Sequence, residues 1–99
     1  MTLLELFQGI SDVSLSKEQV EDYHTALTSL YAQMNLELAD LEKLEAIYFL
    51  KETQDSDIKT KRHWNGSKEG QRMITLKRYI KASDKALSSL KNRLYSRYD

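Results

Sequence analysis

The chain has 99 residues, 40% apolar and 30% charged, which indicates one folded domain rather than a disordered segment. It contains no cysteine, which excludes disulfides, thiolate metal sites and cysteine nucleophiles. The net charge of zero conceals an asymmetry: residues 1–57 contain twelve acidic and three basic side chains, and residues 58–98 contain two acidic and twelve basic ones. This asymmetry indicates either a polyanion site on the basic half or ion pairing between the halves.

Turn-forming residues are scarce, since the chain contains no proline and three glycines. Sheet proteins need many turns, so this scarcity predicts a few long helices. The first nine residues lack the features of a signal peptide, and no stretch approaches the roughly 20 apolar residues that span a bilayer. We therefore expect a cytoplasmic protein that does not bind membranes, in the host cytoplasm if its source is viral.

The first two predicted helices differ in length. Residues 2–9 form a short apolar helix ended by Gly9, and residues 17–53 form a long one. Ser16 and Gln19 have the spacing of a capping box at the start of the long helix. A seven-residue repeat of coiled-coil type follows. One row contains Val20, Leu27, Met34, Leu41 and Tyr48, and the companion row contains Tyr23, Leu30 and Leu44, interrupted by Glu37.

Two further helices are predicted in the basic half. A short helix covers residues 57–64 and is ended by Asn65 and Gly66. A long helix covers residues 67–97, with Ser67 as its N-cap. Its apolar seam contains Met73, Ile80, Leu87 and Leu94, and its second row contains Leu76 and Leu90, interrupted by Ser83.

These elements predict a single all-α domain over residues 1–99, a long antiparallel helical hairpin of coiled-coil type with a short N-terminal helix. Glu37 and Ser83 are equally far from residue 60, so a hairpin centred there brings both into one polar layer. Ser83 or a nearby base such as Lys81 would satisfy Glu37. Two helices cannot bury all these apolar residues, so we expect a homo-oligomer. The predicted oligomer or partner surface contains Leu3, Leu4, Phe7, Ile47, Phe49 and Leu50.

Residue patterns of enzymes are missing from the sequence. His24 and His63 have no ligand or triad partner at a diagnostic spacing, and no glycine-rich phosphate-binding motif is present. The carboxylates between residues 37 and 45 are interpreted as solvated helix surface. We therefore expect no catalytic residues, no metal site and no cofactor.

Basic and aromatic residues gather in the second half, as in proteins that hold phosphates with cations and stack bases on aromatic rings. Trp64, near Arg62, is the best stacking candidate. Two alternatives stay open: Trp64 closes the end of the hairpin against Ile47 and Phe49, and the bases pair with acids of the first long helix. The candidate nucleic-acid contacts are Lys61, Arg62, Trp64, Arg72, Lys77, Arg78, Lys81, Lys91 and Arg93.

Residues 35–95 contain three characteristic segments: LEKLEAIY (41–48), KRHWNGSK (61–68) and LKRYIKASDKAL (76–87). Their pattern resembles that of phage recombination mediators of the UvsY-like type. That resemblance implies an oligomeric helical protein that binds single-stranded DNA and helps to load a strand-exchange recombinase. It also implies that Lys61 and Arg62, which match the basic stretch of that family, contact DNA.

Two functions follow as hypotheses. The first is a non-enzymatic, single-stranded DNA-binding recombination accessory of phage type, with a recombinase as its protein partner. The second is a small phage-type protein-binding factor that docks an apolar helix surface on a phage or host protein. Such a factor could be an inhibitor of a host defence protein, an assembly chaperone or a structural adaptor.

Overall fold

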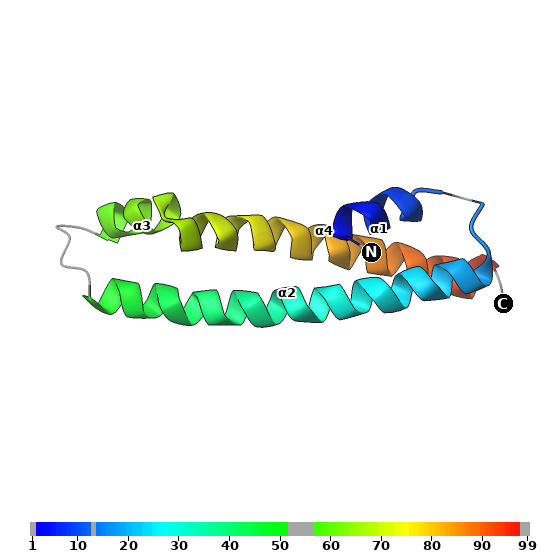
Figure 1. The fold of residues 1–99 in the computed structure, drawn as a ribbon, viewed down its shortest axis with the longest axis horizontal. Helices are drawn as coiled ribbons and strands as arrows, with labels where there is room; N and C mark the ends of the chain where they lie inside the picture. The colour runs from blue at the N-terminus through cyan, green and yellow to red at the C-terminus, as the bar shows by residue number, and fades with distance from the viewer. Residues whose placement is uncertain (1, 13, 52–56, 98–99) are drawn as a thin grey trace.

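The computed structural model describes residues 2–12, 14–51 and 57–97, and within them the chain forms four helices (Figure 1). These are α1 (Leu3–Ile10), α2 (Lys17–Lys51), α3 (Asp57–Gly66) and α4 (Lys68–Arg97). Helices α2 and α4 pack antiparallel along most of their length, and α1 lies against both near the end opposite α3. The molecule is 58 Å long and 22 Å by 18 Å across. The predicted all-α hairpin with a short N-terminal helix is confirmed.

Side-chain caps explain where the first two helices begin. At α1, the Thr2 hydroxyl accepts a hydrogen bond from the amide of Glu5 at 3.2 Å. At α2, the predicted capping box is present: the amide of Gln19 donates to the Ser16 hydroxyl at 3.2 Å, and the amide of Ser16 donates to Gln19 Oε1 at 2.9 Å. Each bond satisfies an amide that the helix itself leaves without a partner.

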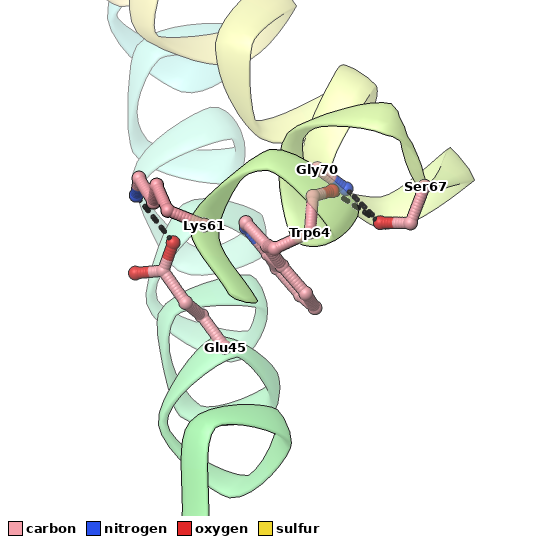
Figure 2. Close-up of polar contacts among 5 residues, drawn as sticks. All are labelled: Glu45, Lys61, Trp64, Ser67 and Gly70. Atoms are coloured by element: carbon pink, nitrogen blue, oxygen red, sulfur yellow. Dashed lines mark hydrogen bonds and ion pairs between the residues drawn. The ribbon is translucent and has the colours of Figure 1, made fainter. Parts of the chain in front are cut away.

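Helices α3 and α4 meet in a tight joint at Ser67, the predicted cap. Its hydroxyl accepts from the amide of Gly70 at 3.0 Å and donates to the carbonyl of Trp64 at 2.6 Å (Figure 2). Helix α3 continues to Gly66, so the prediction that Asn65 and Gly66 end it was wrong by two residues. The reason is that neither residue adopts the positive φ of a helix-ending turn, and the break comes at Ser67 instead.

The two apolar rows expected in the hairpin meet in two core clusters. All four residues of the main α2 row that precede Tyr48 are buried, as predicted. Leu44, placed in the companion row by its spacing, is instead 48% exposed. In α4 the row expected to be secondary is the deepest one, since Leu76, Ser83 and Leu90 are fully buried. The expected ends of α2 at residues 52 and 53 lie outside the described residues.

The predicted polar layer of Glu37 with Ser83 is wrong. Glu37 lies opposite Arg72, eleven residues before Ser83 in α4, which corresponds to roughly 16 Å of helix. The error came from centring the hairpin on residue 60, because α3 packs beside α2 and belongs to the second arm. Ser83 is fully buried, and its hydroxyl has no hydrogen-bond partner within the described part of the chain.

Gly70 provides a direct test of the joint between α3 and α4. A Cβ added at Gly70 would collide with the backbone carbonyl of Trp64, which cannot move without breaking the joint, whereas a Cβ at Gly66 meets open space. We expect Gly70→Ala to lower the free energy of unfolding by about 1–3 kcal/mol. Gly66→Ala, the matched control, should leave it unchanged or raise it by about 0.5–1 kcal/mol. Urea denaturation followed by circular dichroism measures both, and equal stability of the two variants would contradict this account of the joint.

Candidate nucleic-acid interface

Four basic side chains form an exposed stripe on the outer face of α4. Lys77, Lys81 and Lys85 follow one another at four-residue intervals, and Arg78 lies beside them. All four are exposed, and they lie on the face opposite the buried row that contacts α2. None of the four has an ion-pair or hydrogen-bond partner among the described residues. We call these four residues the basic stripe.

Several other predicted contact residues are engaged within the fold. The guanidinium of Arg72 donates to both carboxylate oxygens of Glu37, at 2.6 Å and 3.0 Å. Lys61 forms an ion pair with Glu45 at 2.9 Å (Figure 2). These two pairs match the alternative in which bases pair with acids of the first long helix. Both are partly exposed, and such pairs contribute about 0–1 kcal/mol each.

The remaining predicted cations lie elsewhere. Arg93 donates to the backbone carbonyl of Asp12 at 3.2 Å, which ties the end of α4 to the segment after α1. The Lys91 ammonium lies 6.0 Å from the centre of the Tyr95 ring. Arg62 is exposed on α3, beside a shallow surface groove, and α3 lies at the opposite end of the molecule from the C-terminal part of α4, which contains Lys91 (Figure 1). The nine predicted residues therefore do not form one continuous surface.

Trp64 does not lie where base stacking requires it. Its side chain is 4% exposed, and its ring packs 5.5 Å from that of Tyr48 with the two planes at 48°. The prediction that Trp64 stacks on a base is therefore not supported by this structure, because neighbouring side chains cover the indole. The alternative, that Trp64 closes the hairpin end, agrees with its place in the same core cluster as Phe49, although Ile47 remains exposed.

The residues of the predicted partner surface divide into two groups. Leu4, Ile47 and Leu50 are exposed, with Leu50 87% accessible. Leu3, Phe7 and Phe49 are partly buried and pack against the two core clusters, so they mainly stabilise the fold. Three exposed aliphatic residues, Leu36, Leu44 and Ile58, were missed by the prediction.

Two members of the exposed α4 face were also absent from the predicted contacts. Lys85 continues the four-residue spacing of Lys77 and Lys81, and that spacing could have identified it. Tyr95 follows Lys77 by 18 residues, five full turns of helix, and therefore lies on the same face. Its side chain is 64% exposed.

No family model, no curated protein and no solved structure matches this chain. Within the described residues, no helix is long and apolar enough to cross a membrane, and no cluster of three or more histidine, aspartate or glutamate side chains is placed to hold a metal ion.

The Glu37–Arg72 pair predicts a pH effect on stability. Hydrogen bonds from the Arg72 guanidinium lower the pKa of Glu37 below its ordinary value of 4.5. The pair therefore stabilises the fold above that value, and the contribution is lost as the pH falls through the lowered pKa. Glu37→Gln should reduce the free energy of unfolding by up to about 1 kcal/mol at neutral pH and by progressively less as the pH falls below 4.5, measured by urea denaturation. Glu42→Gln is the control, because Glu42 has no ion-pair partner in the described chain, and its effect on the free energy of unfolding should not depend on pH. The same pH dependence in both variants would show that the Glu37–Arg72 pair does not cause it.

Proposed function

We propose that this chain is a non-enzymatic helical protein that binds single-stranded nucleic acid through the outer face of α4. The observation that carries the proposal is the basic stripe: four cations on one exposed face, without acidic partners within the described residues. Like charges at four-residue spacing on a helix repel one another, and exposed Asp84, which follows Lys81 by three residues, offsets only part of that repulsion. A strand of phosphates would relieve that repulsion.

Phosphate contacts supply most of the affinity in this proposal. Each lysine that neutralises a phosphate releases condensed counterions, which makes binding strong at low salt and indifferent to sequence. Successive lysines of the stripe are separated by about 6 Å of helix rise, so the row follows a backbone along the molecule's long axis. An accessible ring on the same face adds a place for a base, and Tyr95 occupies that position with Lys91 beside it.

The resemblance to UvsY-like mediators extends the proposal to a recombination accessory that helps a recombinase onto single-stranded DNA. Under this proposal the exposed guanidinium of Arg62 and the half-exposed Lys61 give α3 a secondary contact with the strand. Lys61 would exchange Glu45 for a phosphate at little cost, because the pair is partly solvated. The stripe on α4 remains the primary site.

A second candidate function is that of a protein-binding factor, an inhibitor, assembly chaperone or adaptor. The observation that favours it is the exposure of large apolar side chains on α1, α2 and α3, among them Leu4, Leu50 and Ile58. Such side chains dock in apolar grooves of other proteins. A protein-binding factor needs no affinity for oligonucleotides, so an oligonucleotide-binding measurement distinguishes the two candidate functions.

Removing two lysines of the stripe tests the nucleic-acid proposal. The variant Lys77→Ala/Lys81→Ala should bind a single-stranded oligonucleotide more weakly than wild type. The slope of log affinity against log salt should flatten by about 1.4, because each lost phosphate contact contributes about 0.7 for single strands. Fluorescence anisotropy with a labelled oligonucleotide at several salt concentrations measures both quantities.

The matched control removes two lysines outside the stripe. Lys17→Ala/Lys51→Ala carries the same change in net charge on α2 and should retain the wild-type slope. If both double variants flatten the slope equally, binding follows net charge and the stripe is not the site. If wild type shows no binding at low salt, the protein-binding candidate takes its place.

Tyr95 gives a second, independent test of the same face. Tyr95→Ala should weaken oligonucleotide binding by about five- to 150-fold, the range expected from losing one stacked base. The salt slope should stay unchanged, since no phosphate contact is removed. Tyr95→Phe keeps the ring and should retain most of the affinity. Equal losses in the Ala and Phe variants would exclude stacking at this position.

A further inference from the structure

A second heptad pattern runs along the face of α2 that points away from α4. Leu36, Asp40, Lys43, Ile47 and Leu50 are spaced by four, three, four and three residues, as in the seam of a coiled coil. All five are exposed, whereas the row that packs against α4 contains the buried residues of α2. We call these five residues the outer seam.

The outer seam is more apolar than a solvated helix face needs to be. Leu36 is 70% exposed, and Leu50 and Ile47 are exposed as well. Neither Asp40 nor Lys43, which lie between the apolar residues, has an ion-pair partner among the described residues. The face thus combines three unburied apolar side chains with one free acid and one free base.

The order of four of these residues is self-complementary in one orientation only, while Leu50 would lie opposite Gln33. Leu36 and Ile47 are equally far from the midpoint between residues 41 and 42, and so are Asp40 and Lys43. A second copy that runs antiparallel about this midpoint places each Leu36 against an Ile47 and each Asp40 against a Lys43. A parallel copy would instead place like charges against each other at both positions, which is unfavourable.

Residues beside the outer seam fit the same arrangement. Ala39 and Leu44 lie beside the outer seam, on opposite flanks of it. Both are exposed, and Leu44 is the residue that its spacing had wrongly placed in the hairpin core. The twofold axis brings the two copies of Leu44 to one flank of the interface and the two copies of Ala39 to the other.

We propose that the outer seam is the interface of an antiparallel homodimer, in which two copies of α2 pack about a twofold axis between residues 41 and 42. The interface is isologous, because the same patch serves on both subunits. It buries the Leu36 and Ile47 side chains and satisfies Asp40 and Lys43 twice. The basic stripe lies on the opposite side of each hairpin, so the dimer carries one accessible stripe on each outer side. The dimer does not depend on nucleic-acid binding.

Charge reversal within the outer seam tests this dimer in solution. Light scattering coupled to size exclusion should give wild type twice the subunit mass of 11.6 kDa. Asp40→Lys and Lys43→Asp should each raise the dimer dissociation constant at least about tenfold, because each places like charges together twice. The double variant Asp40→Lys/Lys43→Asp exchanges the partners and should restore the dimer. Glu5→Lys, a charge reversal on α1, should leave the mass unchanged, and circular dichroism should show that every variant stays helical.

Cross-linking tests the alignment itself, since the chain contains no natural cysteine. Leu36→Cys protein mixed with Ile47→Cys protein should form a mixed disulfide under mild oxidation, in preference to either protein alone. Ser88→Cys, on the outer face of α4, should not cross-link efficiently with either. A monomeric wild type, failure of the double charge variant to restore the dimer, or cross-linking without preference for the mixed pair would each overturn the proposal. None of these results bears on oligonucleotide binding through the basic stripe.

Discussion

The packing of α2 against α4 is the constraint on which the rest of the structure depends. Each helix presents an apolar row at heptad spacing, and burying both rows fixes which face of each helix points inward. The Glu37–Arg72 pair lies beside this interface and is compatible with one register. Once the inner faces are fixed, the charged residues of the two arms are turned outward. In the described part of the chain, Glu37–Arg72 and Glu45–Lys61 join the arms, while the four bases of the basic stripe stay apart from acidic partners.

This separation gives the two outer sides of the hairpin different properties. The outer side of α4 carries the basic stripe and Tyr95, which suit a phosphate strand with an unstacked base. The outer side of α2 carries apolar residues at heptad spacing with one acid and one base between them, which suit another helix. The proposed nucleic-acid site and the proposed dimer interface thus do not compete for surface. A dimer would offer two such strand-binding faces, which increases avidity for a long strand without any new contact.

Helices, capping box, hairpin and buried α2 row followed from the sequence, because local spacing and chain composition determine them. The alignment of the two arms did not, because it depends on which arm contains α3, a tertiary choice that local patterns do not encode. Tertiary choices of this kind also explain why parts of the predicted nucleic-acid site were wrong. A tryptophan beside bases has the same sequence pattern whether it stacks on a nucleotide or, as Trp64 does, fills a core. Leu44 likewise has the heptad spacing of a core residue and is nevertheless exposed. Whether its side chain points toward α4 depends on the rotation of α2 about its own axis, which the spacing alone does not determine.

The most direct test of the account is a distance across the hairpin. Because Arg72 lies opposite Glu37, the same alignment brings Ser88 opposite Glu21, and both residues are exposed. Spin labels on Glu21→Cys/Ser88→Cys, diluted with unlabelled protein to suppress distances between subunits, report this separation by electron-electron double resonance. Paired arms should give a single narrow distribution comparable with the 22 Å width of the molecule. A distribution reaching several tens of ångströms, toward the roughly 100 Å of a continuous helix, would show that the arms do not pair and that the two outer faces do not exist as described.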